Sequence, residues 1–251
     1  MTKNNTAVKK TGSQSVVYKV PAAFALMILV ILGFWKLAGY HSTLGGFEAL
    51  YGVFGTLGIV FYVLLAGCLA AQFVCRPHLA KTLLRYGAAA SALLAVSFTI
   101  LRTFWTGNMI AIYLLHALVY CLYMVWQLYR SEFFTFSLAT ASAGVVFYLI
   151  AHTAYRANRI IGSIALALVL LAIAFVTFRC SRSRGELQLF GRTLRVFPAS
   201  FNPLLFYFTC VLWAVVLVAC LIFGAGVAYY AMFAAIAVEL IGAVYYTFQL
   251  K

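Results

Sequence analysis

Residues 113–130 read YLLHALVYCLYMVWQLYR, and this stretch decides the class of fold. It is apolar and long enough to cross a bilayer, because a helical crossing takes roughly 20 residues at a rise of about 1.5 Å per residue. Polar groups nevertheless recur along it at alternating steps of three and four residues, which places them on one side of a helix. These are Tyr113, His116, Tyr120, Tyr123 and Gln127. The stretch is therefore predicted to be a membrane-spanning helix with one polar side.

The composition of the whole chain indicates the same class. Of its 251 residues, 66% are hydrophobic and 9% are charged, whereas about a quarter of the residues in soluble domains are charged. Four side chains are acidic, none of them Asp, and the formal net charge is +14. Such a balance can indicate nucleic-acid binding. In a membrane protein, however, the placement of Lys and Arg mainly determines the orientation of the helices in the membrane, so we expect no nucleic-acid partner.

Eight apolar runs are long enough to span a membrane. Their approximate bounds are 20–38, 52–74, 84–104, 109–128, 133–152, 160–178, 203–223 and 226–247. The sequence therefore predicts an all-α, polytopic transmembrane helical bundle. In an alternative with six spans, the segment HTAYRAN at 152–158 would belong to a submerged hairpin.

The distribution of basic residues predicts the orientation. Lys and Arg in short loops are retained on the cytoplasmic side. If the N-terminus is inside, four of the 18 basic residues fall outside and the other 14 fall inside. Those outside are Lys36, Arg102, Arg156 and Arg159. We therefore expect a multi-pass protein of a plasma (inner) membrane with both termini in the cytoplasm.

The chain is expected to contain one domain and one substantial loop. Residues 1–18 are predicted to be a disordered basic cytoplasmic tail, and residues 19–251 a single transmembrane bundle with a basic cytoplasmic loop at 179–202. Within the loop, 187–190 and 193–197 flank Gly191-Arg192, which is typical of a two-residue hairpin. The loop is either a docking platform for a partner or anionic lipid headgroups, or a retention signal that only sets topology. Its candidate contact residues are Arg179, Arg182, Arg184, Arg192 and Arg195.

Small residues recur at helical spacing in several spans. The second span carries Gly52, Gly55 and Gly58, and the third carries Gly87, Ser91 and Ala95. Membrane helices approach closely through such residues because lipid tails provide no hydrophobic reason to associate. These faces form either static packing or an interface that slides.

Glu239 is the ionisable group placed within the hydrocarbon, where a charge costs about 2.5–3.5 kcal/mol. Its neighbours Ala235, Gly242 and Tyr246 are mostly small, so this face of the helix is expected to pack against another helix. The Glu239 carboxyl group is then expected to be neutral and hydrogen-bonded. We expect Tyr120 or Tyr123 to form a hydrogen bond with Glu239. Together with the polar side of residues 113–130, Glu239 would then line a polar seam.

Two functions fit such a seam. In the first, the chain is a non-enzymatic scaffold or accessory subunit of a membrane complex, and the seam holds helices in register. The alternative is a small secondary transporter with a protonatable Glu239 and His116 as a second titrating group. The expected partners are the lipid bilayer, anionic lipid headgroups and other membrane proteins.

Enzyme chemistry has no recognisable signature in the sequence. HExxH, GxSxG and phosphate-loop motifs are absent, and no Asp is present to orient a histidine. The cysteines lie in apolar spans or on the predicted inner side, with spacings unlike a zinc site. We therefore expect no catalytic residues, metal site or cofactor.

Overall fold

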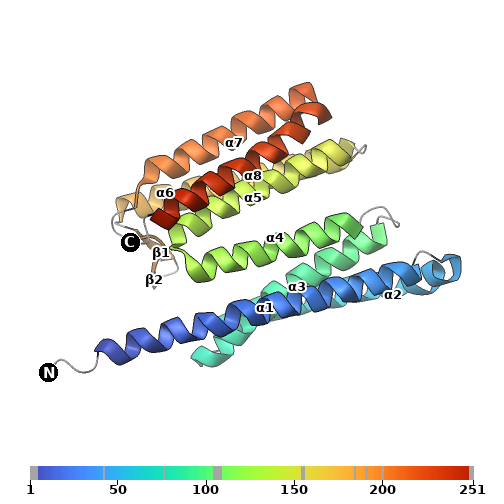
Figure 1. Cartoon of the computed structure of the whole chain (residues 1–251), viewed down its shortest axis with the longest axis horizontal. Coiled ribbons are helices and arrows are strands. Elements are labelled where there is room, and N and C mark those ends of the chain that lie inside the picture. The colour runs from blue at the N-terminus through green and yellow to red at the C-terminus, as the bar shows by residue number, and fades with distance from the viewer. Residues whose placement is uncertain are drawn as a thin grey trace. The chain divides into compact units, whose positions relative to one another are not determined.

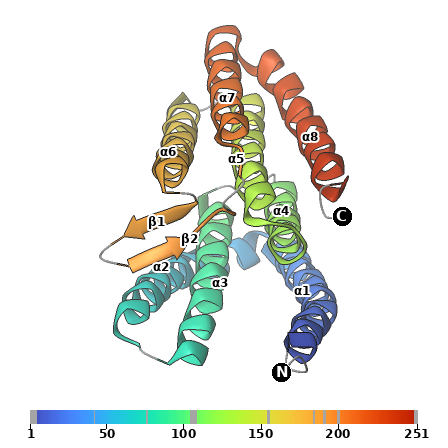
Figure 2. The ribbon, with the colours of Figure 1, turned by 90° about the vertical axis from the view of Figure 1, so that its left-hand side faces the viewer.

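The computed structural model describes residues 5–41, 43–75, 77–103, 109–153, 156–183, 185–189, 192–198 and 201–248. Within these ranges the chain forms eight α-helices, all long and apolar enough to cross a membrane (Figures 1 and 2). They are α1 (Asn5–His41), α2 (Leu44–Val74), α3 (His78–Thr103), α4 (Met109–Leu128), α5 (Ser131–His152), α6 (Arg156–Arg182), α7 (Pro203–Phe223) and α8 (Ala225–Phe248). The prediction of an all-α fold with eight helices long and apolar enough to span a membrane is confirmed. The chain has the architecture of a multi-pass integral membrane protein.

The helices form two compact units, residues 1–120 and 121–251, with the division inside α4. Each unit is described by itself. The prediction of one bundle over residues 19–251 stays a prediction.

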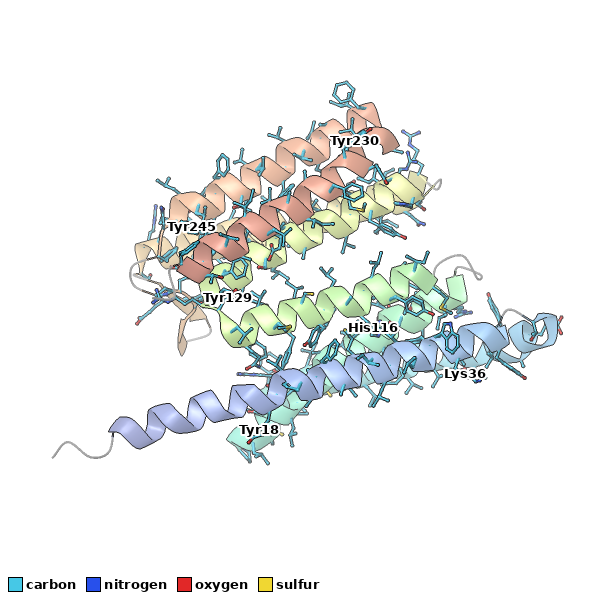
Figure 3. The ribbon with its side chains drawn as sticks, in the orientation of Figure 1. Tyr18, Lys36, His116, Tyr129, Tyr230 and Tyr245 are labelled. Carbon is cyan, nitrogen blue, oxygen red and sulfur yellow. The ribbon has the colours of Figure 1, made fainter. Side chains whose placement is uncertain are left out.

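The first helix begins earlier than the sequence predicts. α1 starts at Asn5, whereas the predicted span begins near residue 20, and Tyr18 lies on this helix with an exposed side chain (Figure 3). Pro21 consequently lies inside α1. Extension of an existing helix is easier than nucleation, because each added residue gains one backbone hydrogen bond. No proline interrupts residues 5–20. Residues 1–4 lie outside the described ranges, and the prediction of a disordered cytoplasmic tail over residues 1–18 stays a prediction.

In the first unit, the small residues of α2 and α3 face each other. A Cβ atom built on Gly58 would lie 3.9 Å from the Cβ atom of Phe98, and one built on Gly87 would lie 3.4 Å from the sulfur of Cys68. These contacts run in opposite directions along the two helices, so α2 and α3 are antiparallel. Ser91 and Ala95 are also buried. The repeated small residues of these spans thus serve close helix packing.

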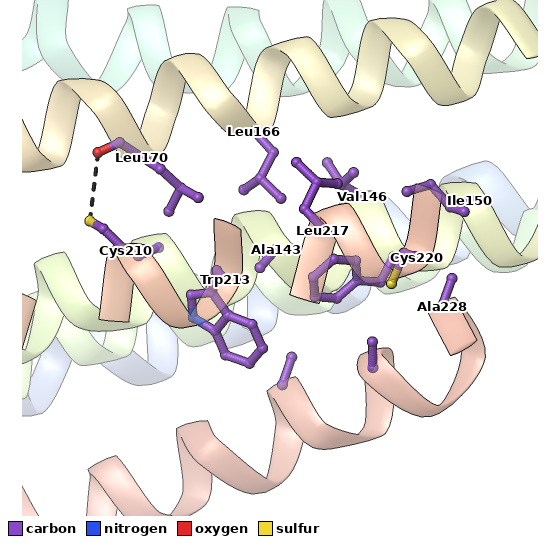
Figure 4. Close-up of a cluster of buried hydrophobic side chains, with 14 of the residues drawn as sticks. Ala143, Val146, Ile150, Leu166, Leu170, Cys210, Trp213, Leu217, Cys220 and Ala228 are labelled. Carbon is purple, nitrogen blue, oxygen red and sulfur yellow. Dashed lines mark hydrogen bonds between the residues drawn. The ribbon is translucent and has the colours of Figure 1, made fainter. Parts of the chain in front are cut away.

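In the second unit, α5 packs against α6, α7 and α8. Its buried face includes Ala143 and Val146, which belong to one apolar cluster with Trp213 and Leu217 of α7 (Figure 4). The Cys210 thiol of α7 donates a hydrogen bond to a backbone carbonyl of α6, with 3.6 Å between sulfur and oxygen. The four helices α5–α8 therefore share a common core.

The α5/α8 contact is antiparallel and is lined by small residues of α8. The buried residues of α8 follow one another at steps of three, four or seven; they are Ala228, Ala231, Ala235, Gly242 and Tyr246. A Cβ atom built on Gly144 of α5 would lie 3.6 Å from the Cβ atom of Ala235. One built on Gly242 would lie only 2.5 Å from the Cε1 atom of Phe136. The ring of Phe136 therefore occupies the space that a side chain at 242 would need.

Between α6 and α7, the chain forms an antiparallel hairpin of β1 (Glu186–Leu189) and β2 (Arg192–Arg195). The predicted hairpin is present, but its register differs by one residue. Leu189 pairs with Arg192, so the connecting residues are 190 and 191 and not the predicted Gly191-Arg192. The base of the hairpin explains this register. The Gly185 carbonyl accepts hydrogen bonds from the backbone amides of Val196 and Phe197, at 3.0 and 3.1 Å, which fixes the two strands relative to each other before the turn is reached.

A substitution at Gly242 tests the α5/α8 contact. We expect Gly242→Ala to lower the free energy of unfolding by about 1–3 kcal/mol, because the new methyl group displaces the buried ring of Phe136. Gly226→Ala on the same helix is the matched control, since a Cβ atom there meets nothing within 4 Å. Unfolding in mixed detergent micelles, followed by circular dichroism, measures both. Equal stability of the two variants would contradict this packing.

Candidate functional site

A hydrogen bond between two side chains crosses the α5/α8 interface within the predicted hydrocarbon. The hydroxyl group of Ser137 on α5 donates to Oε1 of Glu239 on α8, with 2.5 Å between the oxygens. Ser137 is 1% exposed and Glu239 is partly buried. Glu239 stands one turn from Ala235 and one turn from Gly242, on the face of α8 that contacts α5. The small residues on either side allow the backbones to approach closely enough for this bond.

The second carboxyl oxygen of Glu239 is in a different situation. Oε2 is buried and has no hydrogen-bond partner within the described ranges. A polar atom in hydrocarbon needs an internal partner or water, because lipid offers neither donors nor acceptors. Within the described ranges, the chain therefore supplies a hydrogen-bond partner to Oε1 of Glu239 but not to Oε2.

Other polar contacts lie in the same group of helices. Beyond the end of α4, the hydroxyl group of Tyr129 lies 3.0 Å from that of Thr247 on α8. The indole N–H of Trp213 on α7 donates to the hydroxyl group of Thr140 on α5, at 3.4 Å. Two of the polar contacts, Ser137–Glu239 and Thr140–Trp213, involve α5, whereas Tyr129–Thr247 joins the segment before α5 to α8. Each link joins a different pair of chain segments.

Oε1 of Glu239 accepts its hydrogen bond from Ser137 of α5, a residue that the sequence-based prediction did not consider as a partner. In the second unit, the ring of Tyr123 lies 6.1 Å from that of Trp126, and Gln127 is partly buried. Cys121 of α4 interacts electrostatically with Glu239, and Val125 packs near Phe136 and Tyr246. The end of α4 therefore lies near α8, while a bond from Tyr120 or Tyr123 to Glu239 stays a prediction.

The other predicted seam residues belong to the first unit. His116 is 3% exposed, and its Nδ1 atom lies 2.8 Å from the Ile112 carbonyl (Figure 3). Because a carbonyl only accepts, Nδ1 carries the proton, and the buried Nε2 atom has no partner within the described ranges. The ring packs on Phe34 of α1. Tyr120 contacts Phe24 of α1 and Tyr113 packs on the apolar cluster of this unit, so these side chains contribute to helix packing.

The basic residues of the loop separate into two groups. Arg179 and Arg182 are exposed at the end of α6, and each guanidinium lies over the ring four residues earlier, at 5.3 Å from the Phe175 centroid and 4.4 Å from the Phe178 centroid. Such stacking directs both arginines back along the helix. Arg192 and Arg195 are the end residues of β2, while Arg184 lies outside the described residues.

Ser137, Thr140 and Trp213 are the site residues that sequence reasoning did not assign to a polar contact. Ser137 and Thr140 occur among small residues of the fifth span, where they indicate packing. The available signal was the position of Ser137 on the same helical face as Ala141 and Gly144. That signal shows a contact face but does not identify the helix that covers it.

No known protein family matches the chain, and neither a characterised protein nor a solved structure is significantly similar to it.

A double-mutant cycle measures the Ser137–Glu239 bond. We expect Ser137→Ala and Glu239→Leu, which each remove one partner of the bond, to show a coupling energy in unfolding free energy of about 0.6–1.7 kcal/mol, from the average to the largest value measured for hydrogen bonds between membrane helices. Ser142→Ala is the matched control, because the Ser142 hydroxyl group bonds a carbonyl of its own helix. Coupling of Glu239 to Ser142 as strong as to Ser137 would show that the bond is not specific.

Proposed function

We propose that this integral membrane protein is a non-enzymatic scaffold or accessory subunit of a membrane complex. The observation that carries the proposal is the β1–β2 hairpin, which is held firmly at one end of the α5–α8 group and is rich in arginine. The asymmetry of basic residues supports a plasma membrane location with this hairpin and both termini in the cytoplasm.

The hairpin is attached to the helices by a buried aromatic cluster. Two strands of four residues are marginally stable by themselves. Here Leu187 and Val196 pack against four buried side chains. Cys180 and Phe206 lie near the ends of α6 and α7, and Phe197 and Phe201 lie in the segment between β2 and α7. The cluster holds the hairpin in a fixed position, which a loop that only retains positive charge does not require.

The chemistry of the hairpin favours an acidic partner. A two-stranded sheet has two open edges, and an extended segment can pair with either through backbone hydrogen bonds. Arg192 and Arg195 lie in the strand β2, so an acidic segment of another membrane protein suits this edge. Arg179 and Arg182 end a membrane span and stack on lipid-facing rings, which suits anionic headgroups beside that partner.

Photo-crosslinking tests the scaffold proposal. A photoreactive residue in place of Gln188 in β1 is expected to crosslink a specific membrane protein in intact cells, whereas one in place of Glu48 is not. Phe206→Ala should reduce the crosslink several-fold, because Phe206 is 2% exposed and anchors the hairpin. Phe208→Ala on the same helix is the control, since Phe208 is 67% exposed. Absence of a crosslink from position 188, with recovery of the chain as a lone monomer in mild detergent, would contradict the proposal.

A second function is favoured by the unpaired Oε2 atom of Glu239. A small secondary transporter uses an intramembrane carboxyl group that gains and loses a proton or cation. Ser137 and Glu239 lie in the α5/α8 interface, so a change at Oε2 acts directly on two packed helices. This second proposal assigns the carboxyl group to transport and α5 and α8 to the moving elements.

A flux assay distinguishes the two functions. If the chain transports, purified protein in liposomes should carry protons or solute, and Glu239→Gln should abolish that flux by removing the titratable group. Glu48→Gln is the control, because Glu48 is exposed in the first turns of α2. Unchanged flux in Glu239→Gln would remove Glu239 from the mechanism.

A further inference from the structure

The carboxyl group of Glu239 has one oxygen that the described part of the chain leaves unsatisfied. Oε1 accepts a hydrogen bond from Ser137, whereas Oε2 is buried without a partner. An ionised carboxylate would place negative charge on this buried oxygen, to which no hydrogen-bond donor within the described ranges is directed. Burial without compensation disfavours this charged form strongly. The arrangement therefore indicates that Oε2 holds a ligand of positive charge.

A metal cation does not match the donor atoms at the site. Hard cations such as Ca²⁺ and Mg²⁺ take about six or more oxygen ligands, and transporters bind Na⁺ with carbonyls of unwound helices. Here α5 and α8 are continuous helices through Ser137 and Glu239, so their carbonyls are used in helical hydrogen bonds. Within the described ranges, no group of three His, Cys or acidic side chains comes together. The side-chain oxygens of the Ser137–Glu239 pair are too few.

The packing around the carboxyl group also favours a very small ligand. Ala235 is 3% exposed, and Gly242 is buried against Phe136. One turn along the interface, the gap between Gly144 and Ala235 admits no more than a methyl contact, with 3.6 Å between the two Cβ positions. A proton requires no additional volume and removes the negative charge. Of the cations that fit the charge, the proton is the one that also fits the space.

We infer that Glu239 binds a proton on Oε2 while α5 and α8 are packed together, and that this site selects protons over metal cations. The carboxylate takes H⁺ from water to become a carboxylic acid, and it returns H⁺ to water on release. The proton resides on Oε2 because Oε1 accepts the hydrogen bond from Ser137. This inference deepens the transport proposal by naming its ligand, and it holds equally for an acid that only ties two helices together.

Few titratable groups surround this carboxyl group. On α4, Cys121 lies close enough to Glu239 for an electrostatic interaction. Glu132 on α5 and Tyr246 on α8 stand one to two turns away, and Arg130 interacts with Glu132. The buried cysteines of α6 and α7 are Cys180, Cys210 and Cys220. None of these groups supplies a positive charge to Glu239, so protonation is the means by which the site becomes neutral.

Isotope-edited infrared spectroscopy tests the inference, and the sequence makes it tractable because the chain has four Glu and no Asp. The full chain, labelled with ¹³C-carboxyl glutamate and reconstituted in phospholipid vesicles, should show a protonated C=O stretching band at pH 7. Glu239→Gln should remove that band, and Glu48→Gln should leave it. Ser137→Ala should move the band to higher frequency, because the C=O bond at Oε1 loses its hydrogen bond. This shift remains informative if Glu239→Gln fails to fold.

Three results would overturn the inference. The first is the absence of a protonated band at pH 7, and the second is a band that neither Glu239→Gln nor Ser137→Ala alters. The third is loss of the band when Na⁺, K⁺ or Mg²⁺ is added at constant pH, which would show that a metal cation displaces the proton. Failure of liposome flux with the band intact would refute transport and leave the proton site in place, so the two proposals fail separately.

Discussion

The structure depends on the poor solvation of polar groups by hydrocarbon. A carboxyl group in the membrane must find its partners inside the protein, and Glu239 finds Ser137 on α5. That requirement explains why α8 presents small residues on the same face, since only close backbones bring the two side chains into contact. It also sets the antiparallel register of α5 and α8, in which Gly144 meets Ala235 and Gly242 meets Phe136. The other helices of this unit pack on α5.

The interior of the α5–α8 group and the hairpin at one end of it make different contacts. Within the predicted bilayer, the Ser137–Glu239 bond and the Trp213–Thr140 bond hold helices together. Beyond α6, an aromatic cluster fixes the hairpin to the helix ends. The scaffold proposal uses these packed helices as the base of the basic hairpin. The transport proposal uses the same packing, because a change of protonation at one carboxyl group would alter a helix contact. The two proposals therefore differ in whether Glu239 titrates during function.

Local patterns in the sequence predict the parts of this fold that depend on local chemistry. Hydropathy identifies all eight spans, and the neighbours of Glu239 indicate a packed face of α8. The pairing of segments that are distant in the sequence is harder to predict from local patterns. Ser137 resembles a packing residue until α5 and α8 are known to be adjacent, and the hairpin register follows from hydrogen bonds to Gly185 more than from the turn. The early start of α1 reflects helix extension, which composition alone underestimates.

The most direct test of this account is a disulfide crosslink between α5 and α8 in native membranes. In a background without the native cysteines, Gly144→Cys with Ala235→Cys should crosslink readily, because the Cβ positions are 3.6 Å apart and disulfides need about 3.5–4.5 Å. Val145→Cys with Ala235→Cys is the control, since Val145 is 37% exposed. Rapid crosslinking of the 144/235 pair alone is the predicted result. Absence of that crosslink, or equal crosslinking of both pairs, would contradict the α5/α8 register and remove the basis for the Glu239 site.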